Sequence, residues 1–133
     1  MTKRGGGSII NISSVASIRW TGAKYASYAS SKAAVNQLTQ AVALEHAADN
    51  IRVNALLLGY IDTPTVYAGQ TDPTQDEMRR ALAERRIAAC PMGRMGTAWD
   101  VAKASVFLAS DESAYITGSL IRLDGGLSAI VDR

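Results

Sequence analysis

Two short apolar segments separated by one long alanine-rich segment restrict the fold of this chain more than any other feature. Residues 8–13 (SIINIS) and 51–58 (IRVNALLL) have the length and the β-branched content of strands, and neither alternates polar with apolar residues. Strands of that kind are buried on both faces, which is typical of parallel sheets. The intervening residues 27–49 have helical length and composition, and a helical crossover leaves the two strands parallel. We therefore expect an α/β fold.

The remaining segments continue this pattern. The long helix is predicted to pack through an apolar stripe of Ala33, Ala34, Val35, Leu38, Ala41, Val42 and Leu44. Residues 64–75 are predicted to form a loop and residues 76–89 a charged helix. A helix over residues 98–110, with Thr97 as its N-cap, is followed by a third strand at residues 119–123. This order predicts a parallel sheet with helices on both faces, within one domain.

Composition and charge argue against several classes of partner. The chain has 133 residues, of which 14 are basic and 12 acidic, and its net charge is +2. This balance, without a dense basic tract, predicts neither a nucleic acid nor an anionic membrane as a partner. No apolar run reaches the ~20 residues that span a bilayer, and the start of the chain lacks the apolar core of a signal peptide. With Cys90 as the only cysteine, we expect a cytoplasmic protein.

Tyr28 and Lys32 form a candidate catalytic pair. Their spacing of four places both side chains on one face at the start of the predicted helix. Ser13 and Ser14 follow the first strand, so a parallel sheet brings their loop beside the start of that helix, at the carboxyl ends of the strands. A surface lysine beside a half-buried tyrosine has the same spacing, and the pair alone does not separate the two interpretations.

These residue types fit proton transfer to or from a carbonyl oxygen. A free tyrosine has a pKa of about 10, and a lysine cation nearby favours the phenolate form. Such a tyrosine can give a proton to a carbonyl oxygen as hydride arrives, or take one from an alcohol as hydride leaves. A serine hydroxyl beside it can hydrogen-bond the same oxygen and orient the substrate.

Four blocks of sequence together resemble the short-chain dehydrogenase/reductase family. They read GSIINISSVAS, YASSKAAV, IRVNALLLGYIDTP and PMGRMGTAWDVAKASVFLASDESAYITGSLIRLDGG, in the family's order and over nearly the whole chain. The resemblance implies a doubly wound, Rossmann-type parallel sheet. It also implies an oxidoreductase that transfers hydride between NAD or NADP and a small carbonyl or secondary alcohol substrate.

The resemblance assigns roles to three residues of the candidate site. Tyr28 matches the family's proton-donating tyrosine, and Lys32 matches the lysine that tunes it and binds the nicotinamide ribose; both therefore also count as cofactor-binding residues. Ser14, the second serine of a Ser-Ser pair, matches the substrate-orienting serine. The gap from Ser14 to Tyr28 is 14 residues, one longer than the family pattern.

The segment after the second strand resembles the part of the family that lies along the nicotinamide. Gly59, Ile61 and Thr63 match it. The resemblance implies a backbone contact from Ile61, and a backbone and hydroxyl contact from Thr63 to the carboxamide. Leu58 stands where the family usually has proline, which restores an N–H and predicts a looser turn.

The glycine-rich dinucleotide fingerprint of the family does not occur in this chain. The Gly5, Gly6 and Gly7 run precedes a strand and lacks the GxGxxG spacing. The resemblance therefore implies that residues 1–133 are the carboxyl-terminal half of a single NAD(P)-binding Rossmann-type domain, without a second domain and inactive without the amino-terminal half. The implied partners are a separate amino-terminal half, or further copies in a homodimer or homotetramer.

An alternative of a different class is a truncated, non-catalytic oligomerisation module that does not bind cofactor on its own. The long helix after Tyr28 and the last helix and strand resemble the family's subunit-contact elements. The intact mass of the source protein, together with its binding of NADH or NADPH, separates the two hypotheses.

Four arginines on the helix at residues 76–89 admit two interpretations. They are Arg79, Arg80, Arg85 and Arg86. Together they can bind an anionic substrate such as a phosphate or a coenzyme A ester. We instead expect a solvated face, because Glu77 and Glu84 lie nearby. In the family, this region is the variable cover over the substrate, and its loop at residues 65–75 can close on binding.

Other side chains carry weaker signals. Tyr25 has no lysine four residues on, so we assign it to the loop or to the substrate wall. Trp20 and Tyr60 either line a substrate pocket or simply pack. His46 has no potential metal-ligand partner and is expected at the surface, so no metal site is predicted.

Overall fold

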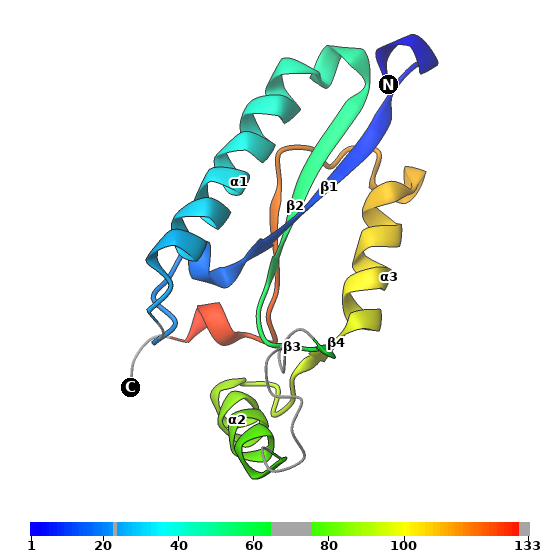
Figure 1. Cartoon of the computed structure of the whole chain (residues 1–133). Coiled ribbons are helices and arrows are strands. Elements are labelled where there is room, and N and C mark those ends of the chain that lie inside the picture. The colour runs from blue at the N-terminus through cyan, green and yellow to red at the C-terminus, as the bar shows by residue number, and fades with distance from the viewer. Residues whose placement is uncertain (23, 65–75, 131–133) are drawn as a thin grey trace.

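Strand β2 (Ile51–Leu58) lies at the centre of a three-stranded sheet, between β1 (Gly7–Ser14) and β5 (Leu120–Leu123). Both neighbours run parallel to β2 (Figure 1). The computed structural model describes residues 1–22, 24–64 and 76–130. The α/β fold with a parallel sheet that the sequence predicts is therefore confirmed.

Both faces of β2 are buried, as its apolar composition predicts. Val53 and Leu56, which point to opposite faces, are 1% and 0% exposed. Asn54 is polar and is nevertheless fully buried. Its side chain donates to the carbonyl oxygen of Ile116 at 2.8 Å and accepts from the N–H of Ser119 at 3.0 Å. Asn54 thus fixes the chain that leads into β5, and its polar atoms are satisfied inside the core.

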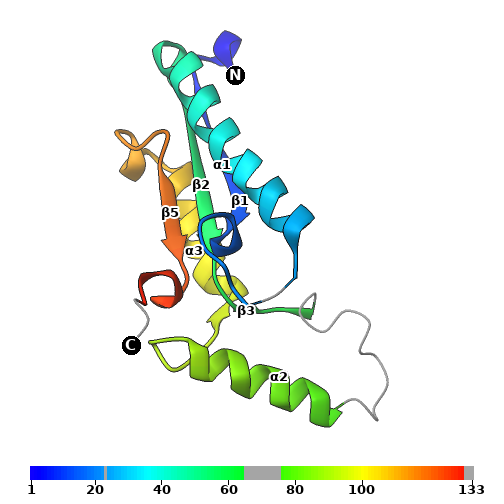
Figure 2. The same ribbon diagram turned by 90° about the vertical axis from the view of Figure 1, so that its left-hand side faces the viewer.

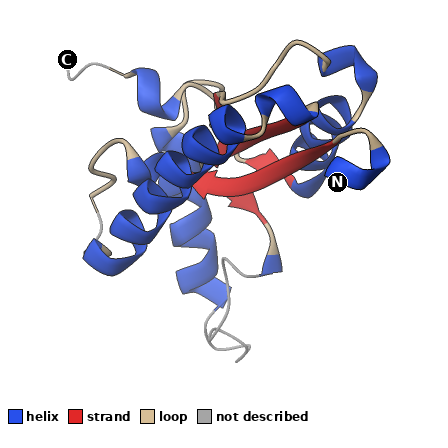
Figure 3. Ribbon diagram, turned by 90° about the horizontal axis from the view of Figure 1, so that it is seen from above, coloured by secondary structure: helices blue, strands red, loops and turns tan. Residues whose placement is uncertain are grey.

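Helices α1 (Ala26–Glu45) and α3 (Ala98–Ala109) cover opposite faces of the sheet (Figures 1 and 2). α1 connects β1 to β2 and packs on both, whereas α3 packs on β1. The view from above shows the strands between helices on either side (Figure 3). α1 ends four residues earlier than predicted, and a short 3-10 turn at Ala47–Asp49 continues the chain.

The face through which α1 packs differs from the predicted apolar stripe. The buried residues of α1 are Asn36, Thr39 and Ala43, whereas Leu38 and Leu44 are 58% and 79% exposed. The buried residues follow the i, i+3, i+7 spacing of one helix face. The predicted stripe was wrong because its residues spread around more than one face, and small or hydrogen-bonded side chains allow α1 to approach the sheet closely.

β1 is an edge strand of the described sheet and is less buried than predicted. Ile9 and Ile10 are half-buried and Ile12 is 43% exposed, whereas Ser13 and Ser14 are buried. An apolar sequence cannot show that a strand has a neighbour on one side only. The buried serines lie at the carboxyl end of β1, where α1 begins to cover it.

The carboxyl end of α3 is tied to the amino-terminal ends of β1 and β2. The Arg52 guanidinium donates to the carbonyl oxygens of Leu108 at 2.9 Å and Ser110 at 3.1 Å. The Ser8 hydroxyl also donates to the Leu108 carbonyl, at 2.7 Å. A cation suits this position because the last carbonyl groups of a helix lack partners within the helix and carry partial negative charge.

Helix α2 (Asp76–Ala89) lies across the carboxyl ends of the strands (Figures 1 and 2). None of its residues is buried. A small parallel sheet of β3 (Ile61–Asp62) and β4 (Gly96–Thr97), which the sequence did not predict, joins the segments before and after it. The loop predicted at residues 64–75 lies almost entirely outside the described residues. Within the described ranges, no helix has the length and apolar character needed to cross a membrane.

Thr97 is the N-cap of α3, as predicted, and Asp100 completes a capping box. The Asp100 N–H donates to the Thr97 hydroxyl at 3.2 Å, and the Asp100 carboxylate accepts from the Thr97 N–H at 2.8 Å. Arg94 donates to the same carboxylate at 3.1 Å. The hydrogen bond from the Thr97 backbone, followed by that from Arg94, lowers the pKa of Asp100 from 3.8 to about 2.

Removal of the cap should destabilise the chain. We expect Thr97→Ala to lower the free energy of unfolding by about 1 kcal/mol, because the first turn of α3 loses an acceptor for a backbone N–H. Urea unfolding measures the difference. Thr97→Ser is the matched control and should stay near wild type, since it keeps the hydroxyl. Equal stability of the alanine and serine variants would contradict a capping role.

Stability should depend on pH through Asp100. Its pKa is lower in the folded chain than in an unfolded chain, so the carboxylate stabilises the fold above pH about 4. This contribution is lost as the pH falls from about 4 towards about 2. We expect Asp100→Asn to flatten the pH dependence of the free energy of unfolding in that window, measured by urea unfolding at stepped pH. An unchanged slope would show that the carboxylate does not supply this pH dependence.

Candidate active site

The carboxyl edge of the sheet brings the two predicted parts of the site together. Ser14 pairs with Leu58 in the register of β1 and β2, so the segments that follow the two strands start at the same edge. A cavity of about 640 Å³ opens there. All six residues predicted as catalytic or cofactor-binding line this cavity: Ser14, Tyr28, Lys32, Gly59, Ile61 and Thr63.

Ser14 is held by the turn that it begins. It is 9% exposed and caps the 3-10 turn Val15–Ser17, because its Oγ accepts the N–H of Ala16 at 3.2 Å. In the part of the chain that the structure describes, the Ser14 hydroxyl donates to no acceptor. The oxygen is therefore fixed while its hydrogen remains available to a bound ligand.

Tyr28 and Lys32 lie one turn apart on α1. The Lys32 Nζ is 5.8 Å from the centroid of the Tyr28 ring, within the range of a cation–π contact. Nζ also donates to the carbonyl oxygen of Ile12 at 2.9 Å, which ties the lysine to β1 and leaves two ammonium hydrogens. Tyr28 is 44% exposed, and no described residue hydrogen-bonds its hydroxyl. Both side chains can therefore reach a ligand in the cavity.

A buried hydrogen-bond network fixes the backbone that carries Ser14. Ser13 donates to the Asn36 side-chain carbonyl at 2.6 Å, and the Asn36 amide nitrogen donates to the Ser17 hydroxyl at 2.7 Å. Ser17 donates in turn to the backbone carbonyl of Ser14. Because Ser13 and Asn36 are 2% and 7% exposed, the loss of one partner would leave buried polar atoms without hydrogen bonds. The network thus joins β1, α1 and the turn between them.

A further wall of the cavity is the segment that follows β2. The Gly59 N–H donates to the carbonyl oxygen of Leu123 at 3.0 Å, and a Cβ at position 59 would lie 2.7 Å from the Asp124 Cα. Position 59 therefore requires glycine, since the ends of β2 and β5 approach so closely. Ile61 is fixed in β3, and Thr63 follows it on the cavity lining.

Two titratable groups beside this wall have shifted pKa values. Burial raises the pKa of Asp124, but hydrogen bonds from Ser128 and Gly126 outweigh it and hold the pKa below its usual value. Burial and the nearby Asp124 charge raise the pKa of the Cys90 thiol. Asp124 is therefore a charged turn residue, and Cys90 stays a neutral thiol and not a nucleophilic thiolate.

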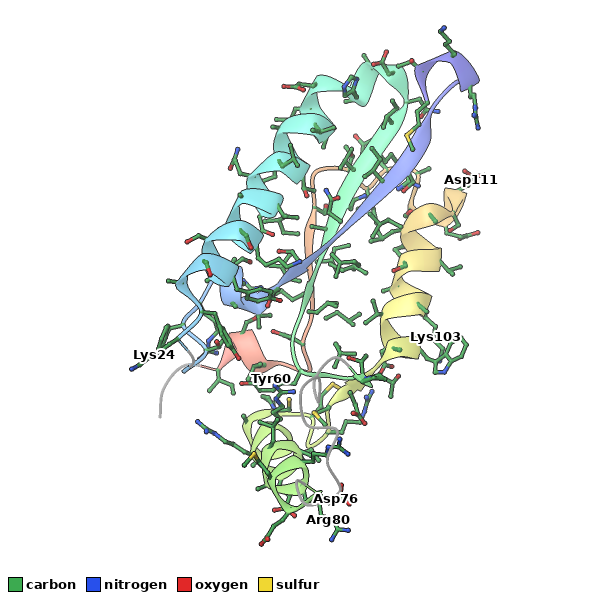
Figure 4. The ribbon with its side chains drawn as sticks, in the orientation of Figure 1. Lys24, Tyr60, Asp76, Arg80, Lys103 and Asp111 are labelled. Atoms are coloured by element: carbon green, nitrogen blue, oxygen red, sulfur yellow. The ribbon has the colours of Figure 1, made fainter. Side chains whose placement is uncertain are left out.

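Aromatic side chains and one arginine complete the cavity. Tyr25 lines it, and its ring meets the Tyr28 ring edge to face with centroids 5.8 Å apart. Tyr60 lies between the sheet edge and α2 (Figure 4), with the Arg86 guanidinium carbon 5.2 Å from its ring centroid. Trp20 is outside the lining and 69% exposed. Of the two aromatic residues left open by the sequence, Tyr60 lines the cavity and Trp20 does not.

The sequence did not single out two residues that the structure places in or beside the cavity, Asn36 and Arg86. Asn36 received no role, although it follows Tyr28 and Lys32 at intervals of four and therefore shares their helix face. Arg86 was assigned to a solvated face together with the other arginines of α2, and the structure places it half-buried on the lining of the cavity. No local pattern distinguishes it from Arg85, since its position depends on how α2 crosses the sheet.

The described residues contain no candidate metal centre. Within residues 1–22, 24–64 and 76–130, no group of three or more histidine, cysteine, aspartate or glutamate side chains is arranged to hold a metal ion. His46 lies at the surface, as expected, with its Nδ1 2.9 Å from a carboxylate oxygen of Asp49.

The chain matches known oxidoreductases along nearly its whole length. Residues 1–128 match the family model described as enoyl-(acyl carrier protein) reductase. Over 127 residues, the chain is 42% identical to the 3-oxoacyl-(acyl-carrier-protein) reductase FabG of Thermotoga maritima. This match covers 96% of the chain and 48% of that relative. Over 123 residues, it is 45% identical to 3β-hydroxysteroid dehydrogenase 1 of Eggerthella lenta, which covers 92% of the chain and 44% of that relative.

Solved structures give the same result for the fold. The crystal structure of a gluconate 5-dehydrogenase from Burkholderia cenocepacia in complex with NADP and tartrate matches with a TM-score of 0.82 and 34% identity. The match covers 98% of this chain and 48% of that structure. The chain thus spans about half the length of its relatives, and the predicted partial Rossmann-type fold is confirmed.

The buried network should contribute measurably to stability. We expect Asn36→Leu to lower the free energy of unfolding by about 1–3 kcal/mol, because the buried Ser13 hydroxyl loses its acceptor at 2.6 Å and keeps only the Lys32 carbonyl oxygen at 3.2 Å. Urea unfolding followed by circular dichroism measures the loss. Gln37→Leu, on the exposed neighbouring position, is the control and should change stability by less than about 0.5 kcal/mol. Equal effects of the two substitutions would contradict the network.

Proposed function

Because the chain belongs to the short-chain dehydrogenase/reductase family, we propose that it carries the catalytic groups of an NAD(P)-dependent oxidoreductase. The substrate is a small carbonyl compound or the corresponding secondary alcohol. The observation that supports this function is that Ser14, Tyr28 and Lys32 line one cavity. The relatives include a 3-oxoacyl reductase and a hydroxysteroid dehydrogenase, whose names describe opposite directions of one carbonyl–alcohol conversion.

Tyr28 is the proposed acid and base. It donates its phenolic proton to the carbonyl oxygen during reduction, and takes a proton from the alcohol during oxidation. Its hydroxyl has no other hydrogen-bond partner among the described residues, so the proton can go to the substrate. The Lys32 cation, 5.8 Å from the Tyr28 ring centroid, stabilises the phenolate that remains after reduction.

Ser14 is the proposed substrate-orienting residue. Its oxygen already accepts the N–H of Ala16, so its hydrogen can be donated to the same carbonyl oxygen that Tyr28 protonates. The network through Asn36 and Ser17 fixes the backbone of Ser14 before substrate binds. This preorganisation lowers the entropy cost of holding the carbonyl in a reactive position.

The cavity offers groups that fit the nicotinamide end of NAD or NADP. Gly59 and Ile61 form a wall without a side chain at position 59, and Thr63 adds a hydroxyl. The Lys32 ammonium keeps two hydrogens for ribose hydroxyls, and Tyr28 lies one turn away. When bound, the cofactor supplies or accepts the hydride. We propose these five residues as its binding residues in this chain.

The domain and its partners also remain proposals. We propose that residues 1–133 form the carboxyl-terminal half of one NAD(P)-binding domain, because the chain spans about half of each relative. The phosphate-binding half then comes from the same polypeptide or from a separate one. Further copies, in a homodimer or homotetramer, would cover the exposed apolar side chains of α1 and α3: Leu38, Leu44, Val106 and Phe107.

The same exposed apolar side chains support a second candidate function, a non-catalytic oligomerisation module. Such a module associates through α1 and α3 and binds no cofactor. The intact mass of the source protein, together with its titration with NADH or NADPH followed by nicotinamide fluorescence, separates the candidates. Saturable binding by a protein of about twice the mass of this chain supports the oxidoreductase, and association without binding by the chain alone supports the module.

Turnover is testable in a chimera in which this chain replaces the matching segment of the Thermotoga maritima reductase. We expect Tyr28→Phe to lower kcat by at least about 100-fold, because the phenolic proton is lost. The affinity for NADPH should change little, since the ring remains. Stopped-flow and steady-state absorbance at the nicotinamide band measure both quantities.

Tyr25→Phe is the matched control for this substitution. Tyr25 lines the same cavity and contacts the Tyr28 ring. Its substitution therefore tests whether loss of any tyrosine hydroxyl in the cavity lowers kcat, or only loss of the Tyr28 hydroxyl. We expect kcat within about threefold of the unsubstituted chimera, because a phenyl ring keeps the edge contact. Retained turnover in Tyr28→Phe would refute the assignment of Tyr28.

A further inference from the structure

Arg86 differs from the other arginines of α2 in its surroundings. Arg80 and Arg85 are exposed, and Arg79 donates to Asp76 at 3.4 Å. Arg86 is half-buried and lines the cavity that holds the candidate catalytic residues. Arg80 and Asp76 lie farther from the sheet edge than Tyr60 does (Figure 4). The helix thus points one of its four cations at the site.

The Arg86 guanidinium is held in place without using its hydrogen-bond donors. Its central carbon lies 5.2 Å from the Tyr60 ring centroid, so the ring supports it by a cation–π contact. Among the described residues it has no hydrogen bond and no ion pair. A guanidinium on an aromatic ring keeps its N–H groups free for a planar anion, which it can bind through two parallel hydrogen bonds.

The cavity around Arg86 carries uncompensated positive charge. Its described lining contains Lys32 and Arg86, and no aspartate or glutamate. Lys32 donates one hydrogen bond, to the carbonyl oxygen of Ile12, whereas Arg86 donates none to the described part of the chain. Two cations without a carboxylate attract an anionic ligand into the cavity.

We propose that Arg86 binds a carboxylate of the substrate, so that the substrates are keto acids and the corresponding hydroxy acids. This inference rests on the proposed function, because it places the second functional group of a substrate whose carbonyl oxygen meets Ser14 and Tyr28. A carboxylate held at Arg86 and a carbonyl held at Ser14 fix the substrate at two points, which orients the reacting carbon. The pyrophosphate of a cofactor is the other anion that a guanidinium can bind, and the test separates the two.

The test is a binding measurement on the whole 133-residue chain, labelled with ¹⁵N and followed by amide chemical shifts. The probes are 4-oxopentanoate, its uncharged methyl ester, and inorganic pyrophosphate. The variants are Arg86→Gln, which removes the charge, and Arg86→Lys, which keeps it. Arg85→Gln is the matched control, because it removes the same charge from the exposed neighbour on the same helix.

We expect wild type and Arg85→Gln to bind the keto acid about tenfold more tightly than its ester, as one charge-assisted hydrogen-bond pair can provide. Arg86→Gln should bind the acid about tenfold more weakly and the ester unchanged, so that the preference disappears. Arg86→Lys should keep a smaller preference, since it retains the charge without the fork of donors. Unchanged amide shifts in the sheet confirm that each variant is folded.

Three results would overturn the proposal: equal binding or no binding of acid and ester by wild type, an undiminished preference in Arg86→Gln, or Arg86-dependent binding of pyrophosphate alone. The last result would assign Arg86 to the cofactor. None of these measurements involves turnover, so a failure here is distinct from a failure of the Tyr28→Phe test. If the Tyr28→Phe chimera is inactive and the chain shows no preference for the acid over the ester, the proposed oxidoreductase function stands and the proposed keto acid substrate is refuted.

Discussion

The parallel pairing of β1 with β2 is the constraint on which the candidate site depends. It aligns Ser14 with Leu58, so the turn that carries the serine and the segment that begins at Gly59 leave the sheet at one edge. A slip of one residue would turn the buried Ser13 away from α1 and break its hydrogen bond to Asn36. Burial of β2 on both faces prevents that slip, because its side chains would then lose the faces on which they pack. Stability of the sheet and geometry of the site therefore have the same cause.

The polar side chains of the site fall into two groups, those that hydrogen-bond to one another and those that keep a hydrogen available for a ligand. Ser13, Asn36 and Ser17 are hydrogen-bonded to one another and to the backbone. Ser14 and Tyr28, in contrast, have hydroxyl hydrogens without an acceptor among the described residues. Both side chains line the cavity, so their hydroxyl hydrogens are available to a ligand there. The Tyr28 side chain is 44% exposed and the Ser14 oxygen accepts the Ala16 N–H, so both hydroxyl hydrogens are open to water or to a bound ligand.

Local signals account for what the sequence could predict. β2 and α2 begin and end at the predicted residues, and Thr97 caps α3, because continuous apolar character, charge pattern and capping chemistry are each encoded within a few residues. The packing face of α1 was predicted wrongly, since Thr39 is buried there while Leu38 is exposed. That choice depends on which side chains the sheet can accommodate. The position of Arg86 likewise arises only when α2 crosses the strand ends, so nothing within α2 itself indicates it.

None of the fourteen residues of α2 is buried, and yet α2 supplies the Arg86 side chain to the cavity. Substitutions along α2 should therefore alter what the cavity accepts while leaving the sheet and the candidate catalytic residues intact. An ancestral chain could acquire a new substrate by changes in this one helix, without passing through unstable intermediates. The arrangement separates the evolution of specificity from the maintenance of the fold. It also identifies α2 as the segment in which a directed-evolution library would find functional diversity at the lowest structural cost.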